Sequence, residues 1–219
     1  MFVIRRMQRN VITVSPTASL FEARERMRRH NIHQLPVTGE NGKLIGILSN
    51  RDIREATLPV ALLRGATEKD AEDLLKETPV EKVMTRKVVT ATLADTLEDA
   101  LVLLHDFRVN SLPVLDEQGR AVGIISRSDV LKAFIDVLGI GEISSRIEVV
   151  VPDRPGGLAR IISVIKAFNV NIASVLTTGH AEEGKRAIFF RVATLNVAPL
   201  KKAIQEAGYQ ILDPSSFHL

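Results

Sequence analysis

The sequence contains no cysteine and no tryptophan, and it has a single tyrosine. The absence of cysteine excludes disulfide bonds, thiolate catalysis and cysteine-ligated metal sites. Because aromatic side chains are so scarce, the chain lacks the stacking platforms that are typical of proteins that bind single-stranded nucleic acids. Its formal net charge is only +3 over 219 residues, which argues against a strongly basic nucleic-acid-binding protein. We therefore expect no nucleic-acid partner.

Long apolar runs are absent as well. No run approaches the ~18 residues that a membrane span needs. The segment from Met1 to Arg6 has no apolar core long enough for a signal peptide. We therefore expect a cytoplasmic protein without a membrane partner.

The motifs of common enzyme chemistries are also missing. The sequence has no Gly-x-Ser-x-Gly nucleophile elbow, no phosphate loop with Gly-Lys-Ser/Thr and no His-Glu-x-x-His. Its carboxylates are scattered along polar helix faces, so no general acid/base pair is indicated. His30 and His33 are close in sequence, but no third ligand type lies nearby, and we expect no metal site. The sequence therefore predicts a protein that is not an enzyme.

An internal repeat dominates the N-terminal part of the chain. Residues 7–52 align without gaps with residues 84–129 at a constant offset of 77. Each copy is predicted to form a strand, a helix, two strands and a second helix. Two copies together predict a pseudo-symmetric pair, because one copy alone would bury too little apolar surface. The expected strands are Gln34–Thr38, Leu44–Leu48, Ser111–Leu115 and Ala121–Ile125, and the expected helices start at Ser19, Ser49, Thr96 and Ser126.

A polar motif, Gly-Ile-hydrophobic-Ser-x-x-Asp, runs from Gly46 to Asp52 and again from Gly123 to Asp129. It lies where a buried strand turns into a helix, so free backbone N–H groups and the helix dipole favour an anion there. The serine hydroxyl could donate to a phosphate oxygen, and the aspartate could accept from the vicinal hydroxyls of a ribose. The glycine leaves space for a flat base. The same Ser-x-x-Asp pattern is also an ordinary helix-capping box, so both interpretations stay open.

With this motif pair and two Leu-Pro-Val strands, residues 1–137 resemble a tandem of CBS domains, often called a Bateman module. The resemblance implies a regulatory role and an adenine-nucleotide-type ligand (AMP, ADP, ATP or S-adenosylmethionine), with no catalytic cofactor. It also implies that each ligand site combines the Ser-x-x-Asp of one copy with residues of the other copy. One implied site comprises Ile12, Ile32, His33, Gln34, Ser126, Arg127 and Asp129. The other comprises Ser49, Arg51, Asp52, Val89, Val109, Asn110 and Ser111, and in both sites the arginine could reach a phosphate.

After Gly141 the repeat pattern ends and a different series of elements begins. The predicted order is strand, helix, strand, strand, helix, strand, which is the ferredoxin-like βαββαβ arrangement. The chain as a whole is therefore expected to be α+β. The expected elements are a strand at Ile147–Val151, an amphipathic helix at 158–168 that exits through Asn169, strands at Asn171–Thr177 and Lys185–Ala193 around a polar loop at Gly179–Gly184, a helix at Pro199–Ala207 and a strand at Tyr209–Leu212.

The stretch Asp153-Arg154-Pro155-Gly156-Gly157-Leu158, followed by Asn171-Ile172, resembles an ACT domain over residues 145–212. The resemblance implies dimerisation, or an amino acid bound at a dimer interface, and of these two we favour dimerisation. The implied ligand residues are Asp153, Pro155, Gly156, Gly157, Leu158, Asn171 and Ile172. Two CBS domains followed by one ACT domain resemble the acetoin-utilisation protein family.

The expected domains are a first CBS unit at 1–57, a connecting segment at 58–78, a second CBS unit at 79–138 and an ACT-like domain at 144–219. The connecting segment is expected to hold a helix at Glu68–Glu77, entered through Leu58-Pro59. The predicted function is a homodimeric regulatory sensor of an adenine nucleotide that controls a partner enzyme. The alternative is a dimeric scaffold that controls its partner without a nucleotide.

Overall fold

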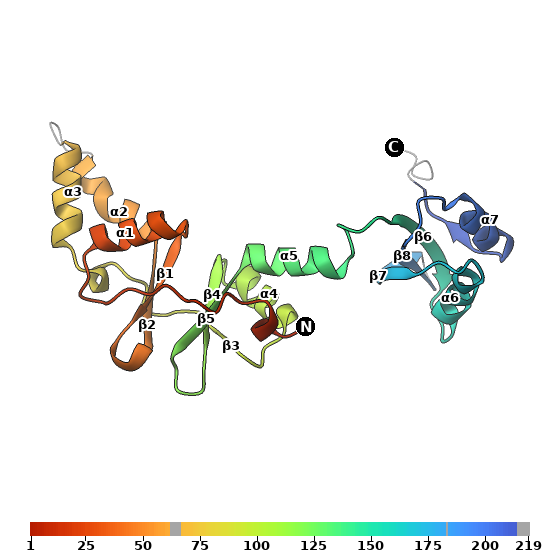
Figure 1. Ribbon diagram of the computed structural model, residues 1–219, viewed down its shortest axis with the longest axis horizontal. Helices are drawn as coiled ribbons and strands as arrows, with labels where there is room; N and C mark the ends of the chain where they lie inside the picture. Colours follow the sequence, from red (N-terminus) through yellow and green to blue (C-terminus); the bar gives the residue numbers. More distant parts are fainter. Residues whose placement is uncertain (62–66, 183, 214–219) are drawn as a thin grey trace. The chain divides into compact units, whose positions relative to one another are not determined.

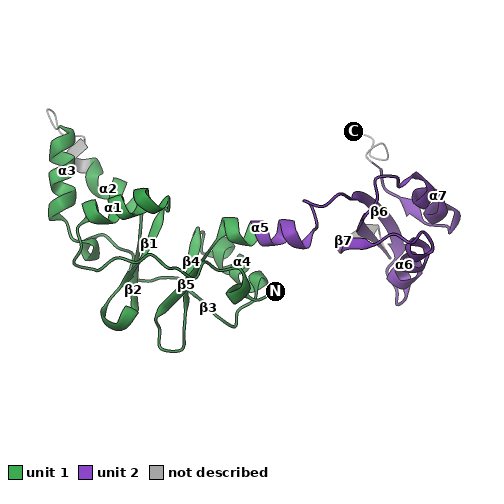
Figure 2. Ribbon diagram, in the orientation of Figure 1, with its two compact units in different colours: residues 1–131 green, residues 132–219 purple. Residues whose placement is uncertain are grey.

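The computed structural model describes residues 1–61, 67–182 and 184–213. The chain divides into two compact units, Met1–Leu131 and Lys132–Leu219, which Figure 2 colours separately. Both units contain helices and strands, so the predicted α+β class is confirmed. No helix in the described part of the chain is long and apolar enough to cross a membrane. The domain bounds given above stay a prediction.

The N-terminal unit contains the two repeats and a helix between them (Figure 1). The hairpins β1–β2 and β4–β5 are antiparallel, and equivalent residues pair in the same register, Leu35 with Leu48 and Leu112 with Ile125. The internal repeat of the sequence is therefore also a repeat of strand pairing. The elements are α1 (Leu20–His30), β1 (Gln34–Thr38), β2 (Leu44–Ser49), α2 (Asn50–Ala61), α3 (Glu68–Glu77), β3 (Ala91–Thr92), α4 (Leu97–Asp106), β4 (Ser111–Leu115) and β5 (Ala121–Ser126), with short 3-10 turns at Val3–Arg5, Glu40–Gly42 and Val80–Lys82. The helix α5 (Arg127–Val137) begins in this unit, and the division between the two units falls within it (Figure 2).

The helix starts follow the predicted caps. Ser19 Oγ accepts a hydrogen bond from the Glu22 N–H at 3.1 Å, at the start of α1. Thr96 and Asp99 form a reciprocal capping box at the start of α4, and hydrogen bonds from the hydroxyl and the backbone of Thr96 hold the pKa of Asp99 below its usual range. Behind these caps each helix buries a matching apolar face, Leu20, Ala23 and Met27 in α1 and Leu97, Ala100 and Leu104 in α4.

Each repeat is completed by the first residues of the other repeat and by the segment just before them. Gln8 pairs with Ile124 through two backbone hydrogen bonds of 2.9 and 3.0 Å, and the equivalent Thr85 pairs with Ile47 through two of 2.9 Å. Val80 lies fully buried in the core of the first repeat. Val3 is equally buried, and its N–H donates to the carbonyl of Asp95 in the second repeat. Neither repeat is therefore an independent folding unit.

The pairing of β2 and β5 with residues of the other repeat explains why the repeated motif has a glycine at Gly46 and Gly123. A Cβ on Gly46 would lie 2.6 Å from Sδ of Met84 and 3.1 Å from the carbonyl oxygen of Thr85. Gly123 has the same relation to Met7. The space that we predicted for a flat base is filled by a methionine of the other repeat, so that part of the prediction is wrong.

The connecting segment differs from the prediction at its start. The helix α2 continues through Leu58 and Pro59 to Ala61, so the first residues of the predicted connecting segment belong to this helix. A proline removes one hydrogen bond from the helix, and packing of α2 against α1 and α3 preserves the helical backbone. The helix α3 matches the predicted Glu68–Glu77 and starts with a capping box between Thr67 and Asp70. The part of the predicted connection at 62–66 lies outside the described residues.

The C-terminal unit has the ferredoxin-like order βαββαβ, as predicted. Its sheet is antiparallel, with strand order β7-β8-β6-β9. The helices bury Ile161, Ile165, Leu200 and Ile204 in a common core with Phe190 of the sheet. The elements are β6 (Ser145–Pro152), α6 (Gly157–Ala167), β7 (Ile172–Glu182), β8 (Lys185–Val192), α7 (Ala198–Glu206) and β9 (Gln210–Ile211).

The exit of α6 and the β7–β8 connection test two local predictions. Asn169 has a φ of 52°, so the predicted left-handed exit of α6 is confirmed. The predicted loop at Gly179–Gly184 is wrong, because β7 extends to Glu182 and pairs there with Lys185. Two register shifts, between Thr177 and His180 and between His180 and Glu182, allow the strand pairing to continue to Glu182.

Candidate functional site

Each Ser-x-x-Asp motif closes on itself. The N–H and Oγ of Ser49 both donate to Oδ2 of Asp52 at 2.7 Å, and those of Ser126 donate to Oδ2 of Asp129 at 2.8 and 2.6 Å. The N–H of each aspartate donates back to the serine Oγ at 3.2 Å. Both motifs are therefore capping boxes. Each serine proton is directed to the aspartate and not to a phosphate oxygen.

The two aspartates differ in their second carboxylate oxygen and in their surroundings. Oδ1 of Asp129 accepts a long hydrogen bond of 3.4 Å from Nε2 of Gln8. Gln8 belongs to the first repeat and pairs with Ile124 of the second. Oδ1 of Asp129 retains acceptor capacity, because a carboxylate oxygen offers two lone pairs. Asp129 is half-buried and lines a cavity, whereas Asp52 is absent from the described residues around that cavity.

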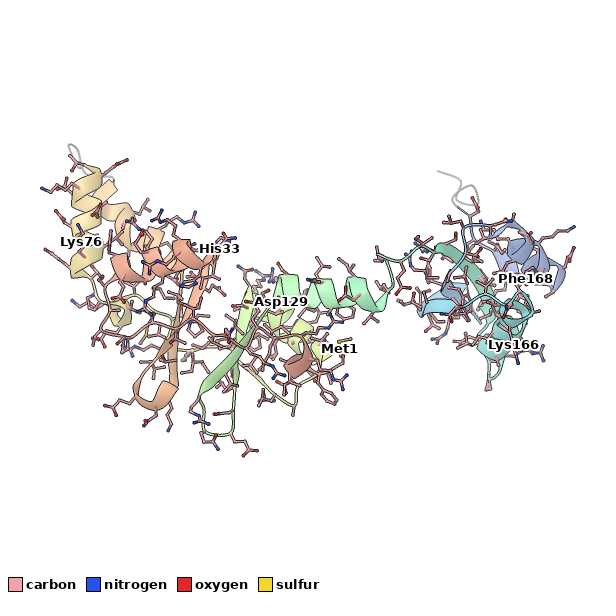
Figure 3. The ribbon with its side chains drawn as sticks, viewed as in Figure 1. Met1, His33, Lys76, Asp129, Lys166 and Phe168 are labelled. Atoms are coloured by element: carbon pink, nitrogen blue, oxygen red, sulfur yellow. The ribbon has the colours of Figure 1, made fainter. Side chains whose placement is uncertain are left out.

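The cavity has a volume of about 1120 Å³ and is lined by residues of both repeats. Figure 3 labels His33 and Asp129, which come from different repeats and both line it. The first implied site is assembled completely, with Ile12, Ile32, His33, Gln34, Ser126, Arg127 and Asp129. From the second implied site the lining includes Ser49, Arg51, Val109, Asn110 and Ser111, but neither Asp52 nor Val89 is among the described residues that line the cavity.

Equivalent residues meet at the start of the two central strands. Oγ of Ser111 donates to Oε1 of Gln34, and the two residues occupy the same position in their repeats. Ser111 is buried. Nδ1 of His33 lies 3.2 Å from Nδ2 of Asn50 at the start of α2. These contacts fix the strand β1, the strand β4 and the first turn of α2 around one cavity.

The arginines of the motif are engaged with the protein. Nε of Arg127 donates to the carbonyl of Val109 at 2.8 Å, and its terminal nitrogen donates to the carbonyl of Leu104 at 3.0 Å. Arg51 forms an ion pair with Glu55 at 2.8 Å on the exposed face of α2. In the structure Arg127 holds the turn between α4 and β4, and the idea that either guanidinium reaches a phosphate stays a prediction.

Sequence reasoning missed several residues that line the cavity. Asn31 and Arg108 occupy equivalent positions and have φ values of 51° and 53°, and the alignment of the repeats could have marked both as turn residues. Arg24 is half-buried on α1 and Arg54 is exposed on α2, and no local pattern distinguishes them from solvated charges. The other missed lining residues are Gln8, Asn10, Val11, Pro36, Asn50, Ile53, Ile124 and Ser128.

The residues implied by the ACT resemblance lie at the start of α6 and at the start of β7. The Asp153 carboxylate is held by Arg186, with contacts of 3.1 and 3.2 Å. Gly156 has a φ of 86°, and a Cβ on Gly157 would lie 3.0 Å from the carbonyl oxygen of Pro152, so the turn itself requires both glycines. Pro155 lies in this turn, Leu158 follows it with 38% of its surface exposed, the Asn171 carbonyl accepts from the Ala193 N–H, and Ile172 pairs with Val192.

Metal ligands do not gather anywhere in the described ranges, where no group of three or more His, Cys, Asp or Glu side chains could hold an ion. The cavity lining itself contains one histidine, His33, and one carboxylate, Asp129. The arrangement is suited to a ligand with hydroxyl donors and apolar surface.

Comparison with known families covers most of the chain. Residues 3–58 and 80–136 match the CBS domain model, and residues 144–214 match the model of the TTHA0829-like ACT domain. Among curated proteins, inosine-5'-monophosphate dehydrogenase from Methanocaldococcus jannaschii is 37% identical over 124 residues, which are 57% of this chain and 22% of the enzyme. The chain thus spans about a fifth of the length of this relative.

Two solved structures are similar to the N-terminal part. The CBS domain pair of protein MJ0100, in complex with 5-methylthioadenosine and S-adenosyl-L-methionine, has a TM-score of 0.52 and 27% identity, and the match covers 61% of this chain and 99% of that one. A structure from Vibrio cholerae, named for acetoin utilization (AcuB), has a TM-score of 0.53 and 27% identity, with 64% of this chain and 95% of that one covered. Both matches agree with the resemblances that the sequence indicated.

Proposed function

Because the chain belongs to the CBS domain family and carries a TTHA0829-like ACT domain, we propose that it is a regulatory sensor of an adenosine-containing ligand. The ligand binds in the cavity between the two repeats and is not converted. The observation that carries the proposal is the complete set of side chains around Asp129, together with its Oδ1 acceptor. The complex of the MJ0100 domain pair with two adenosine derivatives supports it.

The residues have distinct roles in this proposal. One ribose hydroxyl donates to the remaining lone pair of Oδ1 of Asp129, while Oδ2 keeps the capping bonds from Ser126. The half-buried side chains of Ile12 and Ile32 cover the base. His33 offers a ring nitrogen at the rim. The sites around Asp129 and Asp52 are therefore unequal, and we propose that the first one binds the ligand.

The test is calorimetric titration of the full chain with adenosine, AMP, ADP, ATP and S-adenosylmethionine. We expect saturable binding of at least one of them, with one ligand per chain, and no product after prolonged incubation. The ligand adds to the stability of the folded state, so the midpoint of thermal unfolding should rise with its concentration. No heat and no shift with any of the five would overturn the proposal.

The C-terminal domain is proposed to form a homodimer, and through it the sensor acts on a partner enzyme. In the described sheet, β7 is an edge strand, and it exposes 38% of Val175 and 42% of Leu176. An apolar edge of this kind is a surface for strand pairing between copies. We retain the predicted domain bounds at 58, 79 and 144 as part of this proposal.

Dimerisation through β7 can be checked by sedimentation equilibrium. The native chain should sediment as a dimer, and Leu176→Asp should shift it toward the monomer because a carboxylate would replace an apolar contact. Leu195→Asp is the control, since Leu195 is 75% exposed and lies outside β7. A native chain that is monomeric at micromolar concentration contradicts this part of the proposal.

A further inference from the structure

The charges around the cavity are strongly unbalanced. Its described lining contains five arginines, at positions 24, 51, 54, 108 and 127, and one carboxylate, that of Asp129. The whole chain has a formal net charge of only +3, so this concentration of positive charge is local. A concave surface lined by one sign of charge attracts ligands of the opposite sign.

Three of the five guanidinium groups have neither an ion pair nor a side-chain hydrogen bond with the described residues. Arg127 is bound to backbone carbonyls and Arg51 to Glu55. Within the described chain, no ion pair or side-chain hydrogen bond holds Arg24, Arg54 or Arg108, and the guanidinium of Arg24 lies 5.3 Å from the ring centre of Phe21. Arg54 and Arg108 are therefore the groups most available to an anion, while Arg24 also interacts electrostatically with Glu25 and Glu72, which do not line the cavity.

The internal repeat shows that the structure of the pair does not require this charge. The positions equivalent to Arg24 and Arg54 in the second repeat are Leu101 and Leu131. Both leucines are on the surface, with 45% and 62% exposed, and neither is among the residues that line the cavity. The equivalent helices α4 and α5 form with leucine at these positions, so helix formation does not require the arginines. Their shared feature is that they line the cavity.

We infer that Arg24, Arg54 and Arg108 form a subsite for the phosphate chain of a nucleoside di- or triphosphate. This inference rests on the proposed function and narrows it: an adenosine polyphosphate binds more tightly than adenosine, and the sulfonium cation of S-adenosylmethionine is disfavoured. Guanidinium groups suit phosphate because their N–H donors match two phosphate oxygens at once. A cavity of about 1120 Å³ accommodates the nucleoside and its phosphate chain together.

The test compares adenosine, AMP, ATP and S-adenosylmethionine by calorimetric titration of the full chain and of three variants. Arg54→Gln and Arg108→Asn remove one charge each, and asparagine tolerates the positive φ of 53° at position 108. Arg29→Gln removes the same charge from an exposed position of α1 that is not among the cavity residues. The titrations are repeated at low and high salt.

The native chain should bind ATP at least about tenfold more tightly than adenosine, and high salt should remove much of that difference. Arg54→Gln and Arg108→Asn should each weaken ATP binding by about tenfold and leave adenosine binding unchanged, whereas Arg29→Gln should change neither. Equal affinities for adenosine and ATP, or equal losses for both ligands in the variants, would overturn the subsite while leaving the sensor intact. Failure of every ligand, adenosine included, would overturn the proposed function and the subsite with it.

Discussion

Asp129→Ala is expected to weaken the binding of adenosine ligands by about 100-fold, whereas Asp52→Ala should change it by less than about threefold. The reason is the second carboxylate oxygen. In Asp129, Oδ1 accepts a single long bond from Gln8 and belongs to the cavity lining. A hydrogen bond from a ribose hydroxyl to this charged acceptor contributes roughly 1.5–3 kcal/mol, which at its upper end is about 100-fold in affinity. Asp52 is not among the described cavity residues, so its loss removes no ligand contact.

The Asp52 variant is a close match because both aspartates make the same capping bonds to the preceding serine. Both variants should therefore lose a similar amount of stability, about 1 kcal/mol, measured by urea denaturation. Asp129→Asn keeps an oxygen for the cap but replaces the second oxygen with a donor, and it should also lose ligand affinity. If Asp52→Ala weakened binding as much as Asp129→Ala, the assignment of one working site would be wrong.

Val3→Asp is expected to destabilise the N-terminal unit by roughly 3–5 kcal/mol, because it places a carboxylate without a partner in the core. Val3 has no exposed surface, and its backbone is bonded to Asp95 of the second repeat. The effect should appear first in the second repeat although Val3 precedes the first. Hydrogen exchange should therefore accelerate more in α4 and β5 than in β1 and β2.

Phe2→Asp is the matched control, because Phe2 is 53% exposed and adjacent to Val3. It introduces the same charge and should cost about 1 kcal/mol or less. Equal destabilisation by the two variants, measured as the free energy of unfolding in urea, would show that the N-terminal segment is not part of the core. Faster hydrogen exchange confined to β1 and β2 would contradict the conclusion that Val3 completes the core of the second repeat.

Interactions within a few residues of the chain were predictable from the sequence. The strands Gln34–Thr38 and Ser111–Leu115 and the helix Glu68–Glu77 have the predicted bounds. A capping box joins residues three positions apart, and an apolar stripe recurs at the helical period, so each signal is complete within its own segment. The ferredoxin-like order of the C-terminal unit followed from the same local patterns.

The sequence allowed most residues of the site to be named, but it did not show which side chains contact one another. The repeat and the family resemblance indicated twelve residues that the structure brings to one cavity. The sequence also indicated that the two sites differ, in the position of the arginine and in His33 against Asn110, but it left open which of them binds a ligand. A further difference arises from Gln8, which reaches Asp129 from a segment that is far away in the sequence. No local pattern records that contact.

The sequence by itself determined the repeat, the helix caps, the strand pairs and the succession of two domain types, since these depend on hydrogen bonds and burial between near neighbours. Only the tertiary structure decided that residues before each repeat complete the core of the other, as Val3 and Val80 do. It also directed Arg127 to backbone carbonyls while Arg24, Arg54 and Arg108 line the cavity without ion-pair partners in the described chain. The physical reason is that a side chain's partner is set by which distant segments pack beside it, and the same residue type can then cap a turn or face a ligand.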